Sequence, residues 1–274
     1  MLKQRLLTAA LLIPFVVLSI LLLPTDFIQW LLVAVVILAA WEWFSIIGFD
    51  TKNKKLFAIL SLILINVLVS LLPINLLLSL AVIVWGIILV FISYFAHKPL
   101  PAVIHKLVLQ ANIALVVASF ILALFGLSAI ELHSSSSVGP QQLLYVVVLV
   151  WLADTGGYFA GKRWGKTALA KAISPNKTWQ GVAGALVLGI LWAVIGFYLD
   201  ISGTISLFTW LILSIVTSLM SIVGDLFESL FKRCYQVKDS GNLLPGHGGI
   251  LDRIDSLIAA VPVFTAGLYF LGAW

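Results

Sequence analysis

The sequence predicts an all-α integral membrane protein, a polytopic bundle of about nine transmembrane helices. Of its 274 residues, 62% are hydrophobic and only 10% are charged, whereas the apolar share of a soluble globular domain is usually just under half. The mean hydropathy is +1.16. Apolar runs of about 20 residues, long enough to cross the bilayer as helices, follow one another along the chain. A soluble domain is therefore excluded, and the single cysteine, Cys234, excludes an intrachain disulfide framework.

The predicted spans can be taken in chain order from these apolar runs. They cover residues 6–23, 27–48, 56–72, 74–96, 107–129, 142–160, 181–199, 205–227 and 254–272. The first run follows Lys3 and Arg5, as a secretory signal peptide would. No small-x-small cleavage site follows it at residues 21–24, so we expect a retained anchor.

Basic residues occur only in alternate connections between these spans. All 16 lie before span one or after spans two, four, six and eight, whereas the connections around 24–26, 73–75, 131–140 and 200–204 contain none. The positive-inside rule then predicts a cytoplasmic N-terminus and, with nine crossings, an external C-terminus. Membrane orientation also accounts for the net charge of +5, so no nucleic-acid partner is expected.

The chain shows no internal repeat and no connection long enough to form a separate soluble domain. The best internal boundary is the serine run Ser134–Ser137, followed by Gly139 and Pro140. Within one bundle, we expect residues 1–140 to form scaffold spans and residues 141–274 to form catalytic spans with cytosolic loops.

Polar chemistry is concentrated between residues 229 and 255. This stretch reads Ser-Leu-Phe-Lys-Arg from 229, Lys-Asp-Ser-Gly from 238 and Pro-Gly-His-Gly-Gly-Ile-Leu-Asp-Arg-Ile-Asp from 245. Asp225 and Glu228 lie at the cytosolic end of span eight. Asp252 and Asp255 lie at the start of span nine and, three residues apart, are expected to point the same way.

Two carboxylate-bearing helix ends joined by a glycine-rich loop predict a site for a divalent cation. Oxygen ligands without thiolate partners favour Mg²⁺ over zinc. The carboxylates at these two helix ends belong to Asp225, Glu228, Asp252 and Asp255. The alternative is that these acids form helix-end salt bridges with neighbouring basic residues, and the two arrangements are compatible.

The glycine-rich loop is predicted to cradle phosphate. Gly246, Gly248 and Gly249 permit backbone conformations that let amide groups approach an anion. His247 either donates to a phosphate oxygen or packs within the loop. The basic residues of the stretch either neutralise substrate phosphates or serve only membrane topology. They are Lys232, Arg233, Lys238 and Arg253.

A second polar segment, residues 154–181, is predicted to lie on the same side of the membrane. Ser174 followed by Pro175 predicts the N-cap and first position of span seven. Lys177 and Thr178 would then lie in its first turn, where amide groups and the helix dipole favour phosphate.

Two other features of this segment bear on chemistry. Asp154, along span six, is expected either to face substrate or to make a polar contact between helices. The run 161–167, which contains Lys166, is not a P-loop, because three residues instead of four separate its glycines and no strand precedes it.

Glu42 lies between Trp41 and Trp43 near the cytosolic end of span two. Tryptophan is enriched at membrane–water interfaces. The sequence therefore predicts an interfacial belt here, with the carboxylate of Glu42 reaching water or pairing with a lysine.

Residues 229–255 resemble, almost position for position, the signature of the phosphatidate cytidylyltransferases, also called CDP-diacylglycerol synthases: S-x-L-K-R, K-D-x-G and P-G-H-G-G-x-x-D-R-x-D. Residues 154–181 also resemble this family's pattern. Gln180 stands where such families commonly carry glutamate, which argues against an essential charge at that position. The resemblance implies that CTP and phosphatidate react to give CDP-diacylglycerol and pyrophosphate. The short basic N-terminus and the absence of an appended domain favour a bacterial plasma membrane, with the site on its cytosolic face, and an endoplasmic reticulum protein would need the same topology.

The resemblance also implies roles for individual residues. It implies Mg²⁺ bound by Asp225 and Asp252, with Asp255 as a further ligand, a potassium ion beside it, and a homodimer formed through membrane spans. The other catalytic positions are Lys232, Arg233, Lys238, Asp239 and His247. Substrate binding is expected from Asp154, Lys166, Ser174, Lys177, Thr178, Gly246, Gly248, Gly249 and Arg253.

Two other function classes fit the sequence less well. CDP-alcohol phosphotransferases carry a D-G-x-x-A-R core, and this chain contains no Asp-Gly pair. Transporters usually place coupling acids near mid-membrane and often contain inverted repeats, whereas these acids lie at one face beside a basic loop. A transporter would release no pyrophosphate.

Overall fold

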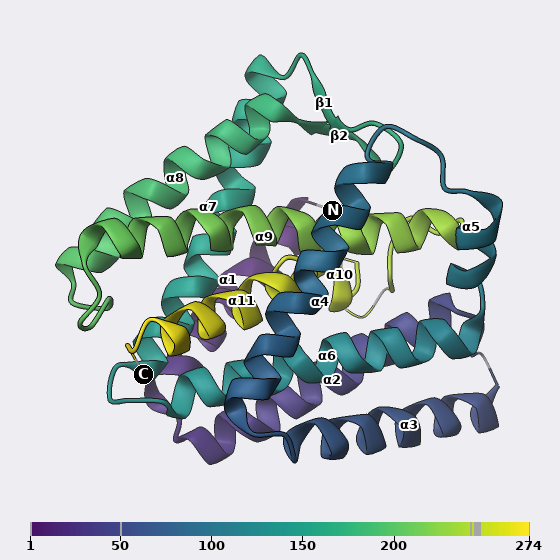
Figure 1. Cartoon of the computed structure of the whole chain (residues 1–274), viewed down its shortest axis with the longest axis horizontal. Coiled ribbons are helices and arrows are strands. Elements are labelled where there is room, and N and C mark those ends of the chain that lie inside the picture. The colour runs from purple at the N-terminus through teal and green to yellow at the C-terminus, as the bar shows by residue number, and fades with distance from the viewer. Residues whose placement is uncertain (1, 50, 242, 244–247, 274) are drawn as a thin grey trace.

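The computed structural model describes residues 2–49, 51–241, 243 and 248–273. The chain folds into a helical bundle with one small hairpin (Figure 1). The elements are α1 (Leu2–Leu22), α2 (Thr25–Ile46), α3 (Lys52–Ser70), α4 (Ile74–Phe95), α5 (Ala102–Val108), α6 (Ala111–Ser134), α7 (Gly139–Trp164), β1 (Ala168–Ala170), β2 (Ser174–Thr178), α8 (Trp179–Tyr198), α9 (Leu207–Cys234), α10 (Leu251–Ile254) and α11 (Leu257–Phe270). The predicted class, an all-α polytopic membrane protein, is confirmed.

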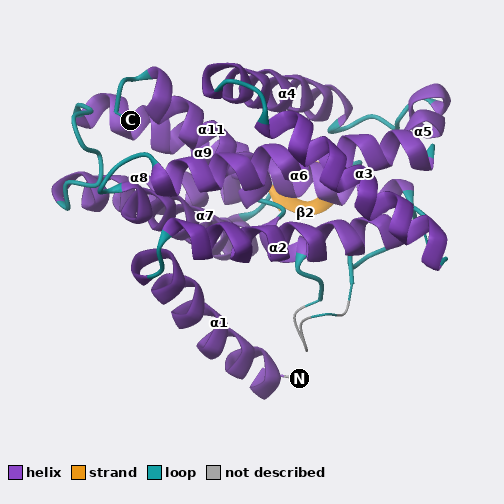
Figure 2. Ribbon diagram, turned by 90° about the horizontal axis from the view of Figure 1, so that it is seen from below, coloured by secondary structure: helices purple, strands orange, loops and turns teal. Residues whose placement is uncertain are grey.

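Eight helices in the described part of the chain are long and apolar enough to cross a membrane. Seven of them are α2, α3, α4, α6, α7, α8 and α9, and the eighth is the stretch Leu251–Phe270 that contains α10 and α11. The first predicted span corresponds to α1, whose apolar part is the shorter Ala10–Leu22. Figure 2 shows α1 leaning away from the bundle. The nine predicted spans thus correspond to eight full-length apolar helices and α1.

Some helix boundaries differ from the predicted ones. The fifth predicted span, 107–129, is divided into α5 and α6, because Gln110 is extended (φ −73°, ψ 105°) and lies at the N-cap of α6. Helix α9 continues to Cys234, beyond the predicted end at residue 227. Its additional turns contain Glu228 and Lys232, so these side chains are held by a continuous helix.

The connection between α7 and α8 contains an antiparallel hairpin that the sequence did not predict. Ala168 pairs with Thr178 and Ala170 with Ser174. The prediction that Ser174 and Pro175 begin span seven is therefore wrong. Proline fits a short edge strand as well as a first helical turn.

Thr178 is the residue that caps α8. It is extended (φ −128°, ψ 155°), and its Oγ1 accepts a hydrogen bond from the amide of Gly181 at 3.1 Å. Threonine is a favourable N-cap for this reason. Lys177 consequently lies in β2 and not in the first turn of α8.

Helix α9 runs through the middle of the bundle (Figure 1) and packs against α4, α7, α8 and α11. Aromatic side chains fill the space around it: Trp43, Trp85 and Trp210 are fully buried. The ring centroids of Tyr145 and Trp210 are 4.6 Å apart, and those of Trp43 and Phe231 are 5.1 Å apart. Many large aliphatic side chains on the outer helix faces are exposed, as expected for surfaces that face lipid.

Small residues bring α7 and α8 unusually close together. A Cβ atom on Gly184 would lie 2.5 Å from the carbonyl oxygen of Gly156 and 2.3 Å from the Cβ of Ala160. Small residues at such positions let membrane helices pack backbone against backbone. This contact holds α8 and the preceding β1–β2 hairpin beside the C-terminal half of α7.

Candidate active site

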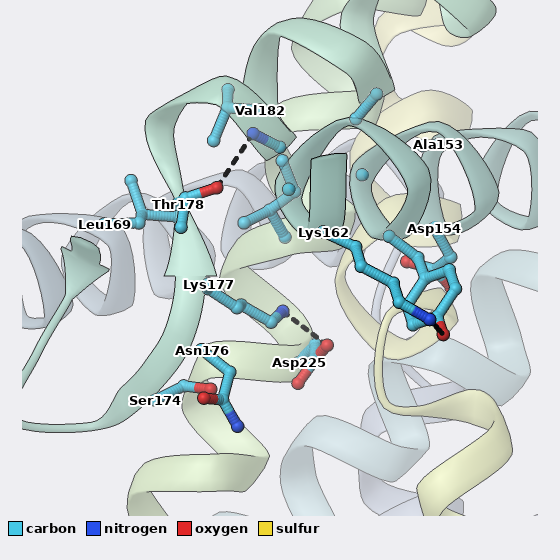
Figure 3. Close-up of a pocket in the computed structure, with 16 residues that line it drawn as sticks. Ala153, Asp154, Lys162, Leu169, Ser174, Asn176, Lys177, Thr178, Val182 and Asp225 are labelled. Carbon is cyan, nitrogen blue, oxygen red and sulfur yellow. Dashed lines mark hydrogen bonds and ion pairs between the residues drawn. The ribbon is translucent and has the colours of Figure 1, made fainter. Parts of the chain in front are cut away.

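A cavity of about 750 Å³ opens between α7, the β1–β2 hairpin, α8 and α9 (Figure 3). It brings together five of the predicted site residues from three elements, α7, β2 and α9. Its lining consists of Ala153, Asp154, Gly157, Tyr158, Gly161, Lys162, Leu169, Ser174, Asn176, Lys177, Thr178, Gly181, Val182, Ala185, Ile222 and Asp225. Polar and charged groups thus converge on a concave surface, as in a ligand site.

The central contact of this cavity is an ion pair between Lys177 on β2 and Asp225 on α9. Figure 3 shows the lysine side chain extending from the hairpin toward the carboxylate. Both side chains are about one quarter exposed, at 25% and 27%. The second oxygen of Asp225 accepts a hydrogen bond from the Oγ of Ser229 at 3.2 Å. The ammonium and the carboxylate are therefore both accessible to a ligand.

Two more carboxylates act electrostatically on this pair. Asp154, exposed on α7, interacts with the charges of Asp225 and Lys177. Asp255 interacts with the same two charges and with Asp154. Three carboxylates thus lie within electrostatic range of one another, together with the cations Lys177 and Arg253.

Gly224 lets the backbone of Asp255 pack closely against α9. A Cβ atom on Gly224 would lie 2.4 Å from the carbonyl oxygen of Asp255 and 3.1 Å from the Cβ of Ala259. Any larger residue would push α9 and the α10–α11 stretch apart.

Gly224→Ala is therefore expected to destabilise the protein by about 1–3 kcal/mol, the usual cost of overpacking. Gly86→Ala is the matched control, because a Cβ atom on Gly86 in α4 would meet nothing within 4 Å. Thermal unfolding in detergent compares the two variants. An equal midpoint for both would show that the α9–α11 contact is not tight.

A second charged cluster lies around Lys232. Its Nζ is 2.5 Å from the Oε2 of Glu228 and 2.8 Å from the Oδ1 of Asp252. Asp252 also accepts hydrogen bonds from the amides of Gly249, at 2.9 Å, and Ser240, at 3.2 Å. The local salt bridges that the sequence allowed are therefore present at Asp252. Asp252 and Asp255, although three residues apart, make different hydrogen bonds, since Asp255 accepts the amide of Ser256 at 2.7 Å.

Lys232→Met is expected to cost about 3–5 kcal/mol of stability, since it leaves two largely buried carboxylates without their cation. The side chains of Lys232, Glu228 and Asp252 are only 14%, 2% and 14% exposed. Lys106→Met, at an exposed position of α5, is the matched control. The measurement is the unfolding midpoint in detergent, and near-identical midpoints would remove the structural role assigned to Lys232.

Glu42 corrects the sequence prediction for the Trp-Glu-Trp run. Trp41 is 42% exposed and has the ammonium of Lys55 at 4.2 Å from its ring centroid, as an interfacial residue would. Glu42, however, is only 3% exposed. Its carboxylate accepts hydrogen bonds from the Oγ of Ser240 and the amides of Ile250 and Leu251, at 2.9–3.1 Å. The predicted exposure of this acid is wrong, because its partners are loop donors that lie about 200 residues away along the chain.

The remaining predicted residues divide into three groups. Gly246 and His247 lie outside the described residues. Arg233, Lys238, Asp239, Lys166 and Arg253 are exposed, and the charge of Arg253 interacts with Asp154. Gly248 has a positive φ of 82°, and the amide of Gly249 donates to Asp252.

Gln180 has a role that explains why no charge is needed at this position. Its Oε1 accepts hydrogen bonds from the amides of Lys166, at 3.1 Å, and Thr167, at 3.3 Å. A neutral amide oxygen suffices for both contacts. Gln180 thus fixes the chain that leads from α7 into the hairpin.

Of the predicted metal ligands, Asp225 faces the cavity, whereas Asp252 lies in the cluster around Lys232. Within the described residues, no group of three His, Cys, Asp or Glu side chains is already arranged as metal ligands. Both oxygens of Asp252 are used by Lys232 and loop amides. Asp225 is half-buried and faces the cavity. Its carboxylate offers oxygen ligands of the kind that magnesium and calcium prefer, and the two oxygens contact Lys177 and Ser229.

Comparison with known proteins identifies the family. Residues 3–271 match the model of the cytidylyltransferase family. Proteins named phosphatidate cytidylyltransferase from Pseudomonas aeruginosa and Haemophilus influenzae are each 36% identical to this chain, over 99% of its length and 98% and 100% of theirs. The protein of that name from Thermotoga maritima is 32% identical over 96% of this chain and 94% of its own. The chain therefore belongs to the cytidylyltransferase family.

Proposed function

We propose that this protein is a phosphatidate cytidylyltransferase, which joins CTP and phosphatidate into CDP-diacylglycerol with release of pyrophosphate. The observation that carries the proposal is the cavity in which Lys177 and Asp225 meet at one end of the bundle. It offers cationic donors for phosphate and carboxylates for a cation on the same surface. The names of relatives that match nearly the whole chain support the same reaction.

The surroundings of the cavity support a position at the membrane surface. Tyr158, Trp164 and Trp179 are 60%, 65% and 55% exposed beside it, and such residues are enriched at membrane–water interfaces. The basic residues of the α7–α8 connection favour the cytosolic side of a bacterial plasma membrane. Phosphatidate keeps its acyl chains in the bilayer while CTP arrives from the cytosol, so a cavity at this depth is accessible to both substrates.

The chain's own residues would act mainly by positioning and by neutralising charge. The phosphate of phosphatidate is largely dianionic near neutral pH, so one of its oxygens can attack the α-phosphorus of CTP without a strong general base. The bond from this oxygen to the α-phosphorus forms as the bond from the α-phosphorus to the bridging oxygen breaks, and pyrophosphate leaves with the electron pair. Lys177 and Lys162, which both line the cavity, would donate to phosphate oxygens and hold the two anions in line.

A divalent metal ion is general in cytidylyltransferases, and we propose that it is Mg²⁺ in this protein. Asp225 and Asp255 are the residues best placed to hold it, with Asp154 nearby. When bound, it would reduce the repulsion between the triphosphate and the lipid phosphate. Asp252, the other ligand that the sequence predicted, would instead hold the loop through Ser240 and Gly249. A potassium ion beside Mg²⁺ and a homodimer remain predictions of the family resemblance.

Pyrophosphate release by the purified protein in detergent micelles tests the reaction. We expect release only when CTP, phosphatidate and Mg²⁺ are all present. Omitting each component in turn provides the controls. Absence of release from folded protein with all three components would contradict the proposed function.

A further inference from the structure

We infer that Glu42, in the N-terminal half of the chain, is a positioning residue that fixes the loop preceding Asp252 against α2, and that cytidylyl transfer depends on it. The dependence of the reaction rests on the proposed function, whereas the contact itself is a property of the fold. Glu42 does not line the cavity. It would therefore act through other residues and is not itself catalytic.

The burial of Glu42 calls for strong partners. A carboxylate inside an apolar span is costly unless its oxygens are satisfied. Among the described residues, no lysine or arginine forms an ion pair with it. Its oxygens instead accept hydrogen bonds from Ser240, Ile250 and Leu251. The negative charge is thus held by neutral donors of one loop, and such charge-assisted hydrogen bonds are stronger than neutral ones.

These donors come from two separate parts of the loop between α9 and α10. Ser240 lies in its first half, and Ile250 and Leu251 lie where it meets α10. The same carboxylate oxygen, Oε2, accepts hydrogen bonds from the Oγ of Ser240 at 3.1 Å and from the amide of Leu251 at 2.9 Å. Glu42 therefore connects these two parts of the loop to each other and to α2.

Asp252 closes the loop in parallel with Glu42. Its carboxylate accepts hydrogen bonds from the amides of Ser240 and Gly249. The hydroxyl of the same Ser240 donates to Glu42. Lys232 then ties Asp252 to α9. Ser240 and residues 249–251 of the loop are thereby held by two carboxylates, Glu42 from the N-terminal half of the chain and Asp252 from the C-terminal half.

The backbone is shaped to receive this carboxylate. A Cβ atom on Gly249 would lie 2.3 Å from the Oε2 of Glu42, and one on Gly241 would lie 2.6 Å from its Oε1. Only glycine allows the chain to approach so closely at these two positions. The loop backbone and the carboxylate of Glu42 are therefore closely complementary in shape, and a small displacement of either would break the contact.

The consequence for the reaction follows from what the loop connects. It joins α9, which carries Asp225, to the stretch that carries Asp255. Releasing the loop end at Leu251 would let Asp255 shift relative to Asp225. Misplacement by about 1 Å can lower a rate by about 100-fold, so a residue outside the cavity can govern turnover.

Glu42→Gln tests the inference in the full-length protein. The variant keeps the size of the side chain but replaces one acceptor oxygen with an NH₂ donor that faces other donors. We expect hydrogen exchange of the amides at 249–251 to become about tenfold faster, as when one charge-assisted hydrogen bond is lost. We also expect kcat to fall by about tenfold or more, with the KM for CTP within about threefold of its original value.

Two further variants make the result decisive. Glu131→Gln, on the partly exposed end of α6, is the matched control and should change neither quantity. Ser240→Ala removes a single donor and should shift both quantities in the same direction by a smaller factor, so it serves if Glu42→Gln does not fold.

The outcomes separate the two claims. Unchanged exchange at 249–251 in both Glu42→Gln and Ser240→Ala would overturn the inference. Faster exchange with unchanged kcat would overturn its catalytic part. A wild-type protein that releases no pyrophosphate would instead contradict the proposed function, while the exchange comparison would still decide whether Glu42 holds the loop.

Discussion

Asp225→Asn is expected to lower the rate of pyrophosphate release by about two to three orders of magnitude. The carboxylate forms an ion pair with Lys177, accepts a hydrogen bond from Ser229 and faces the cavity. Asparagine keeps the shape of the side chain but removes the charge that would hold a cation and orient the lysine. Loss of one preorganised electrostatic group from an active site typically has an effect of this size. The measurement is the rate at saturating CTP and phosphatidate across a Mg²⁺ titration.

Asp200→Asn is the matched control for this prediction. Asp200 is exposed just beyond the far end of α8 and has a positive φ of 57°, a conformation that asparagine also adopts readily. The Asp200→Asn variant should release pyrophosphate at the same rate as the unchanged protein. If Asp225→Asn retains activity within a few-fold at every Mg²⁺ concentration, the metal assignment is wrong.

Lys177→Met should mainly weaken substrate binding. Lys177 presents the ammonium nearest Asp225 in the cavity, and a charge-assisted hydrogen bond contributes about 1.5–3 kcal/mol. We therefore expect the apparent KM for CTP or for phosphatidate to rise by about 10- to 150-fold. Titrating each substrate with the other saturating shows which phosphate the lysine binds.

Lys171→Met provides the comparison, because Lys171 lies exposed at the turn of the same hairpin. It removes an equal charge from the same loop without altering the cavity lining. If both KM values are unchanged in Lys177→Met, or if they rise equally in the two variants, Lys177 contributes only loop charge.

The bundle could be predicted because apolar length alone decides where most helices lie. The hairpin could not, since Ala168–Ala170 is too short to show strand alternation and Ser174 with Pro175 imitates a helix start. Lys177 and Asp225 were both recognised as site residues, but their contact depends on the hairpin folding back over α9. The contact could therefore only be seen in the structure.

Glu42 shows a different limit of the sequence. An acid within an apolar run was a signal of function, but its tryptophan neighbours favoured an interfacial position. Its actual partners include two backbone amides, at Ile250 and Leu251, and any sequence carries such groups. Side-chain patterns cannot identify partners of this kind. The same holds for the hydrogen bond that the amide of Gly249 donates to Asp252.

The most direct test follows the α-phosphate of CTP. Purified protein is incubated with phosphatidate, Mg²⁺ and CTP labelled with ³²P at either the α or the γ position, and the lipid is then extracted. Cytidylyl transfer at this cavity predicts that the α label enters the lipid fraction, that the γ label stays in water as pyrophosphate, and that Asp225→Asn slows the transfer by about two to three orders of magnitude. Label entering the lipid from the γ position, or from neither position, would contradict cytidylyl transfer.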